Sequence, residues 1–160
     1  MPFLEDMNVG HRRELGSFTF TADAIKTFAR EFDPQPFHLD EEAGRNSLFG
    51  GLAASGWHVA SVCMKLLVAD GVRARREAEA RGEEFGTGGP SPGFRDLRWL
   101  KPVIAGDTLR YSSEVVSARA TASKPGWGIV ESRNVAVNQR GEDVYSFLGI
   151  VFLPQRNAGR

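Results

Sequence analysis

The sequence predicts an α+β fold in which an antiparallel sheet packs against one long helix. In the first half of the chain, apolar residues recur at helical spacing, and over 59–67 they form a wide stripe. The second half holds four segments rich in Val, Ile, Phe, Tyr, Thr and Ser, with turn residues between them. Short turns join antiparallel neighbours, so these segments predict a meandering sheet that covers the helix.

The composition is that of one domain over residues 1–160, without disulfides or structural zinc. Of the 160 residues, 41% are apolar, which supplies enough material for a core. Cys63 is the only cysteine, so an internal disulfide is excluded and a reducing compartment is favoured. Because 20 Lys and Arg balance 20 Asp and Glu, the charge gives no reason to expect nucleic-acid or membrane binding.

Neither the start of the chain nor its charge-free stretch looks like a membrane or export signal. The first 15 residues lack the apolar run of a secretory signal, which predicts a cytoplasmic protein. No charged residue occurs over 46–64, yet Gly, Ser, Asn, His and Trp make this stretch too polar for a spanning helix. It is more typical of a helix inside a folded domain.

The expected elements follow in order along the chain. Weak alternation predicts a strand over 14–20, and Thr21 can cap a helix over 22–32 that Pro34 ends. Asp40 is the expected cap of a second, short helix. The long helix follows Gly56 and continues into a charged, solvated extension over 73–84, and a Gly-rich linker leads to the strands. The strands are expected over 94–100, 108–120, 127–138 and 143–153.

Two residues of the Asp-Pro-Gln-Pro-Phe-His segment are the best candidates for chemistry. The two prolines restrict the backbone, so the segment is expected to be a stiff loop. A stiff loop can hold the carboxylate of Asp33 and the imidazole of His38 around one water molecule. The alternative is that Asp33 only ends a helix and His38 is an ordinary surface residue.

Gly56 and His58 at the start of the long helix also admit two interpretations. The backbone N–H groups at a helix N-terminus can stabilise developing negative charge, and Gly56 lets a ligand approach closely. Alternatively, Gly56 serves only close packing. For His58 we expect a packing or capping role.

These motifs together resemble the MaoC-like dehydratases, the (R)-specific enoyl-CoA hydratases of the hotdog fold. The resemblance covers about residues 15–153 and rests on three segments: Ala29 and Arg30 followed by the loop over 33–40, then the glycines over 49–56, and the Pro-Val-x-x-Gly-Asp turn over 102–107. It implies a sheet wrapped around a helix from about Leu52 to Ala69, with residues 73–93 as a charged and Gly-rich insertion.

The resemblance also implies the site. Asp33 and His38 would be the acid–base pair, and the Gly56 N–H would bind the thioester oxygen. Gln35 and Ser55 stand where the family often has Asn and His, respectively, and Met64 stands where some hydratases have Ser. All three are expected to be substrate-binding residues. Phe49, Trp57 and Met64 are candidates for the wall of the acyl pocket or, alternatively, for ordinary core packing.

The implied reaction is the reversible addition of water to a trans-2-enoyl-CoA or enoyl-carrier-protein, giving a 3-hydroxyacyl thioester. No metal or redox cofactor is implied, because CoA or pantetheine is part of the substrate. The expected partners are the acyl thioester and a second copy of the chain, as a homodimer or dimer of dimers. Two alternatives stay open: a hotdog thioesterase, disfavoured because 56–69 holds no acid, and a catalytically silent acyl-binding module.

Overall fold

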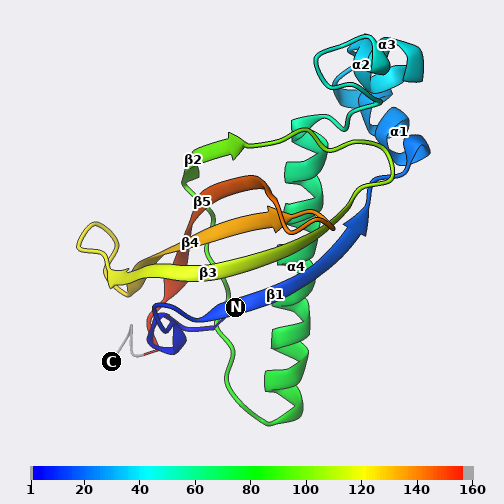
Figure 1. Cartoon of the computed structure of the whole chain (residues 1–160). Coiled ribbons are helices and arrows are strands. Elements are labelled where there is room, and N and C mark those ends of the chain that lie inside the picture. Colours follow the sequence, from blue (N-terminus) through cyan, green and yellow to red (C-terminus); the bar gives the residue numbers. More distant parts are fainter. Residues whose placement is uncertain (1, 157–160) are drawn as a thin grey trace.

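A five-stranded antiparallel sheet wraps around a 25-residue helix in the computed structural model, which describes residues 2–156 (Figure 1). The strand order is β1-β3-β4-β5-β2. The strands are β1 (Arg12–Thr19), β2 (Gly93–Trp99), β3 (Thr108–Ala120), β4 (Trp127–Val137) and β5 (Asp143–Pro154). The α+β prediction is thus confirmed. Met1 and residues 157–160 of the predicted domain lie outside the described residues.

The helices lie in three places. They are the short 3-10 helix η1 (Leu4–Asp6), α1 (Ala22–Phe32), α2 (Pro36–Leu39), α3 (Glu41–Arg45) and α4 (Gly56–Ala80). Helices α1, α2 and α3 gather at one end of the molecule, the long helix α4 crosses the sheet, and the 3-10 helix η1 lies against β3 and β4. In Figure 1, α1, α2 and α3 lie together beside the end at which α4 begins. Thr21 and Asp40 cap α1 and α3 as predicted, by accepting hydrogen bonds from the N–H groups of Ala24 and Ala43.

The sheet departs from the predicted meander at one strand. The chain connects β3, β4 and β5 as antiparallel neighbours, in agreement with the short turns between them. Strand β2, however, pairs with β5 at the far edge, with Arg98 opposite Ser146 and Trp99 opposite Tyr145. The connection from β2 to β3 is therefore a crossover between the two halves of the sheet rather than a hairpin, and the predicted pairing of these two strands is wrong.

The long helix begins later than the resemblance implied. Residues 52–54 are extended because they pair with the β2–β3 connection, where the Ala54 N–H donates to the Val103 carbonyl and Ala53 bridges Ile104. Helix α4 starts only at Gly56. The charged extension is helical as predicted, but it ends at Ala80 rather than Glu84. The proline segment is partly helical, since Pro36 opens α2 instead of lying in a loop.

The core lies between α4 and the inner face of the sheet. Its buried members include Phe20, Ile25, Val59, Val62, Cys63, Leu109, Tyr111, Val144 and Tyr145. The Tyr111 hydroxyl donates to the Val59 carbonyl at 3.2 Å, which ties β3 to the helix. Buried Asp70 forms ion pairs with Arg13 of β1, at 2.5 Å, and with Arg73 of its own helix. Within residues 2–156, no helix is both long and apolar enough to cross a membrane.

Candidate active site

Asp33 and His38 lie next to each other at the junction of α1 and α2. Asp33 is the C-terminal cap of α1, and its N–H donates to the Ala29 carbonyl at 2.9 Å. Pro36 then starts α2 and turns the chain back, so that His38 faces the cap residue. The distance from His38 Nε2 to Asp33 Oδ2 is 3.5 Å. The structure therefore brings together the two residues that the sequence singled out.

The imidazole of His38 is held in one orientation. Its Nδ1 lies 2.7 Å from the carbonyl oxygen of Ala53, and only 6% of its side chain is exposed. Because a carbonyl only accepts hydrogen bonds, Nδ1 carries the hydrogen. In the neutral ring, Nε2 then keeps its lone pair, and this atom faces Asp33. Phe37 contacts the imidazole edge-on, with the ring centroids 4.6 Å apart, and Phe49 stacks on it at 6.2 Å.

The carboxylate of Asp33 accepts hydrogen bonds on both oxygens. The Ser55 hydroxyl donates to Oδ2 at 2.6 Å, and the Gln35 amide donates to Oδ1 at 2.7 Å. Burial raises the pKa of Asp33, but the hydrogen bonds from Ser55 and Gln35 and the charge of His38 outweigh it, so the pKa is below the ordinary value of 3.8. Asp33 is therefore ionised at neutral pH.

Gly56 opens α4 beside this pair, and its missing Cβ makes room for Trp99. A Cβ on Gly56 would lie 2.4 Å from Cε2 and 2.5 Å from Nε1 of the Trp99 indole. This contact supports the close-packing interpretation of the glycine. Within residues 2–156, the Gly56 N–H has no hydrogen-bond acceptor, as is usual in the first turn of a helix. The group is thus also free to bind a negatively charged atom.

The other predicted site residues fall into two groups. Gln35, Phe49 and Ser55 contact Asp33 or His38 directly. Trp57 is half exposed, donates its backbone N–H to the Ser55 hydroxyl, and packs its indole edge-on against Trp99 at 5.3 Å. Met64 is also half exposed and lies two turns further along α4, about 12 Å from Gly56 along the helix axis.

The structure adds two groups that the sequence analysis did not name. The carbonyl of Ala53 orients His38, and no side-chain pattern could have revealed it because the contact is made by the backbone. The indole of Trp99 covers Gly56 from the edge strand β2. It went unnoticed because the sequence places β2 beside β3, whereas β2 lies at the other edge.

The structure also has a surface cavity away from Asp33 and His38. This cavity of about 450 Å³ lies along β1 and β3, lined by residues that include Arg12, Glu14, Arg110 and Ser112. Its lining contains no adjacent acid and imidazole, in contrast to the site at Asp33 and His38. Among residues 2–156, no three His, Cys, Asp or Glu side chains are arranged to hold a metal ion.

Comparison with known proteins finds relatives among MaoC-like proteins and hydratases. A family model described as a MaoC-like domain matches residues 6–138. The crystal structure of a MaoC-like dehydratase from Rhodospirillum rubrum is similar over 98% of this chain and 99% of its own, with 41% identity and a TM-score of 0.80. Mesaconyl-CoA hydratase of Cereibacter sphaeroides is 38% identical over 65 residues, which is 41% of this chain and 19% of that protein.

A more distant structure shows the fold alone. A conserved hypothetical protein of Mycobacterium tuberculosis, described as having a double hotdog fold, matches 99% of this chain and 46% of its own, with 20% identity and a TM-score of 0.75. One unit of a double hotdog therefore corresponds to this whole chain. The sheet wrapped around α4, the match over residues 6–138 and these structural relatives show that the chain belongs to the MaoC-like domain family and has the hotdog fold.

Proposed function

We propose that the protein is a hydratase of 2-enoyl thioesters, which adds water reversibly to give a 3-hydroxyacyl thioester. The observation that carries this proposal is the Asp33–His38 pair, in which the ionised carboxylate and the Nε2 lone pair face each other at 3.5 Å. Both atoms are hydrogen-bond acceptors, and both lie within reach of one water oxygen. Such a pair can orient a water molecule and remove its proton.

The reaction balances with these two residues alone. A water molecule donates one hydrogen bond to Asp33 Oδ2 and another to His38 Nε2. Its oxygen lone pair points at the β-carbon of the substrate. The C–O bond forms as the pair takes one proton, and the electrons of the double bond move to the thioester oxygen. The α-carbon then takes a proton from the pair, which returns to its starting state. Dehydration is the same sequence in reverse.

The negative charge on the thioester oxygen needs a donor, and we assign this role to the N–H of Gly56. The group is the first N–H of α4, so the helix dipole adds to its attraction for an anion. One preorganised donor of this kind is worth about 3 kcal/mol in other enzymes. Phe49, Trp57 and Met64 offer apolar surface to the acyl chain, and the CoA or carrier-protein thioester belongs to the substrate.

Hydrolysis of the thioester has less support from the residues around the helix. Residues 56–69 contain no acid, and the next one, Asp70, is buried in ion pairs with Arg13 and Arg73. A carboxylate so engaged is not free to attack a carbonyl carbon or to activate water for it. The names of two similar proteins, the Rhodospirillum rubrum dehydratase and the mesaconyl-CoA hydratase, support water addition as well.

We further propose that a second copy of the chain covers the exposed apolar face of α4. Trp57, Met64, Val68 and Val72 are each about half exposed and lie on one side of the helix. The contact between Trp57 and Trp99 continues this surface onto the edge strand β2. A structure of the double hotdog fold, in which this chain matches 46% of the length, is the precedent for two such units packed together.

Sedimentation velocity tests the second copy. The wild-type protein is expected to sediment as a dimer or a dimer of dimers, and Val68→Glu is expected to shift it to monomers, because a charge cannot be buried in the interface. Val9→Glu is the matched control, since Val9 is equally exposed but lies outside α4. A wild-type monomer, or an unchanged oligomer of Val68→Glu, would contradict the proposal.

A hydratase assay tests the main proposal. Purified protein is mixed with trans-2-enoyl-CoA esters of short and medium chain length and with mesaconyl-CoA, and loss of the conjugated enoyl absorbance is followed. Released thiol is trapped in parallel. Burial raises the pKa of the Cys63 thiol to about 12, so this residue does not contribute to the thiol signal of the folded protein.

The variants Asp33→Asn and His38→Ala complete this experiment. Loss of enoyl absorbance without thiol release, abolished in both variants, is the expected result. Thiol release instead would identify a thioesterase. Binding of an enoyl thioester without turnover, unaffected by either variant, would identify a catalytically silent binding module and overturn the assignment of the pair.

A further inference from the structure

A continuous set of hydrogen bonds connects His38 with the Gly-Asp turn before β3. The His38 imidazole donates from Nδ1 to the Ala53 carbonyl at 2.7 Å. Ala53 lies in the extended segment 52–54, which pairs with residues 103–105 through Ala54 N–H to the Val103 carbonyl, at 2.7 Å, and Ala105 N–H to the Leu52 carbonyl, at 2.9 Å. The position of the Ala53 carbonyl is thus set by residues 103–105.

Asp107 holds residues 103–105 in place. Its Oδ2 accepts a hydrogen bond from the Ile104 N–H at 2.9 Å, and its own N–H donates to the Ile104 carbonyl at 2.9 Å. Gly106 adopts a φ of +98°, which the turn between the two residues requires and which side chains disfavour. The Asp107 side chain therefore closes the turn that carries the partner strand of Ala53.

The same turn is also connected to the start of α1. The Phe20 N–H donates to the Asp107 carbonyl, and the Gly106 N–H donates to the Phe20 carbonyl, both at 2.8 Å. Helix α1 begins two residues later and ends at Asp33. Both members of the acid–base pair are therefore connected to Asp107, Asp33 through α1 and His38 through Ala53.

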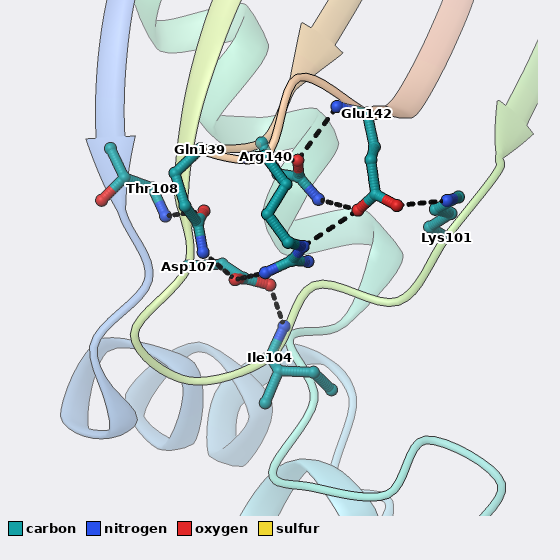
Figure 2. A network of polar contacts seen from close by, with 8 residues as sticks. Lys101, Ile104, Asp107, Thr108, Gln139, Arg140 and Glu142 are labelled. Carbon is teal, nitrogen blue, oxygen red and sulfur yellow. Dashed lines mark hydrogen bonds and ion pairs between the residues drawn. The ribbon is translucent and has the colours of Figure 1, made fainter.

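The other carboxylate oxygen of Asp107 is bound from the turn between β4 and β5, as Figure 2 shows. Oδ1 accepts from Gln139 Nε2 at 2.6 Å and from Arg140 Nη1 at 3.3 Å. Arg140 also donates to Glu142, which in turn accepts from Lys101 at 2.6 Å. Asp107 is only 6% exposed, so this network keeps a buried carboxylate satisfied and fixed.

We propose that Asp107 is a positioning residue for His38. By fixing the Ala53 carbonyl it keeps the hydrogen of the neutral imidazole on Nδ1 and the lone pair of Nε2 toward Asp33. An outer contact of this kind sets both the tautomer and the ring orientation of a histidine. The effect on catalysis rests on the function proposed above, but the effect on the His38 tautomer does not.

Three variants separate positioning from general stability. Asp107→Ala removes the acceptor for the Ile104 N–H. Asp107→Asn keeps an oxygen at that place and tests rescue by a similar side chain. Lys101→Met removes only the outermost ion pair of the network and is the control. If Asp107→Ala unfolds below the working temperature, Gln139→Leu takes its place, since it removes the shorter of the two hydrogen bonds to Oδ1, leaves the one from Arg140, and so loosens the carboxylate without removing it.

The first readout is the tautomer of His38, measured by two-bond ¹H–¹⁵N spectra of the histidine side chains and assigned by its loss in His38→Gln. We expect the Nδ1–H form in the wild-type protein, in Asp107→Asn and in Lys101→Met, and a mixture of tautomers in Asp107→Ala. In the hydratase assay, kcat is expected to fall on the order of 10-fold to 100-fold in Asp107→Ala, with a smaller change in KM.

The two readouts distinguish failure of this inference from failure of the proposed function. An unchanged His38 spectrum in folded Asp107→Ala or Gln139→Leu would overturn the inference, as would an equal change in Lys101→Met. A changed spectrum in a protein that hydrates no enoyl thioester would leave the positioning role intact and overturn the proposed function instead.

Discussion

The hydroxyl of Ser55 donates a hydrogen bond to Oδ2 of Asp33 at 2.6 Å, across 22 residues of sequence. The Ser55 hydroxyl oxygen also accepts a hydrogen bond from the Trp57 N–H at 3.2 Å and so caps α4. One side chain thereby fixes the start of the long helix and the carboxylate of the candidate site. Ser55 thus links the Asp33 carboxylate directly to the start of α4, next to the N–H of Gly56.

Replacing Ser55 with Ala is expected to affect both stability and the pH dependence of activity. Loss of the cap should lower the free energy of unfolding by about 1 kcal/mol. Loss of the hydrogen bond to Asp33 should raise the pKa of that carboxyl toward its ordinary value, so the acid limb of the kcat/KM profile moves to higher pH. Urea unfolding and a pH–rate profile measure the two effects.

A second cap provides the control for this variant. Thr21→Ala removes the cap of α1, which accepts a hydrogen bond from Ala24, and does not touch Asp33. It should cost a similar free energy of unfolding and leave the acid limb where it is. Equal displacement of the limb in both variants would show that Ser55 acts only through stability.

Gln35→Glu tests the second donor to Asp33 with a side chain of nearly the same shape. The Gln35 amide donates to Oδ1 at 2.7 Å, and a carboxylate at this place removes the donor and adds a like charge. The pKa of Asp33 should rise, and the acid limb of kcat/KM should move to higher pH. Gln155→Glu, which adds the same charge after β5, should leave the profile unchanged. A profile unaltered by Gln35→Glu would mean that Asp33 ionisation does not limit the rate.

Gly56→Ala tests whether the glycine is required by the packing of Trp99. The added Cβ would lie 2.4 Å from the indole, so the ring or the start of α4 must move, at a cost of about 1–3 kcal/mol. Tryptophan fluorescence and thermal unfolding should both change. Gly56→Ala is expected to lose activity if the start of α4 moves. Because the N–H of residue 56 is kept, adding Trp99→Ala to the same chain removes the collision and should recover most of that activity. Continued inactivity of the double variant would show that the absent Cβ itself admits the substrate.

His58 is expected to make stability depend on pH. Burial among Phe20 and Phe28 lowers its pKa to about 4, against an ordinary value of 6.5, and its Nδ1 has no hydrogen-bond partner in the described chain. Between pH 6.5 and 4 the unfolded chain binds a proton that the folded protein does not. The contribution of His58 to the free energy of unfolding should therefore be constant above pH 6.5. Between pH 6.5 and 4, the free energy of unfolding should fall by up to about 1.4 kcal/mol per pH unit as the pH is lowered.

The variant His58→Phe should remove this dependence. Urea unfolding at pH 5, 6 and 7 measures the slope, and His11→Gln, which removes an exposed histidine instead, should retain it. The predicted packing role of His58 is borne out by its stack on Phe28, with centroids 4.6 Å apart and planes 3° from parallel. A slope that persists in His58→Phe would assign the acid sensitivity to other groups.

Much of this protein was predictable from local sequence, since helical and strand periodicity depend on neighbours a few positions apart. The periodicity placed α1, the charged part of α4 and the strands β3, β4 and β5 within a few residues of their observed bounds. The two prolines and the five-residue spacing likewise predicted that Asp33 and His38 belong together, because Pro36 fixes how the chain returns after α1.

The tertiary structure decided what depends on residues far apart in the chain. It placed β2 at the far edge of the sheet, kept residues 52–54 extended against 103–105, and set Trp99 on Gly56. It also supplied the Ala53 carbonyl to His38 and the Ser55 hydroxyl to Asp33, across 15 and 22 residues. Local patterns carry no information on such contacts, because the packing of the whole chain determines which backbone groups meet a given side chain. The sequence thus determined which residues are candidates for chemistry, and the packed fold determined their orientation and their neighbours.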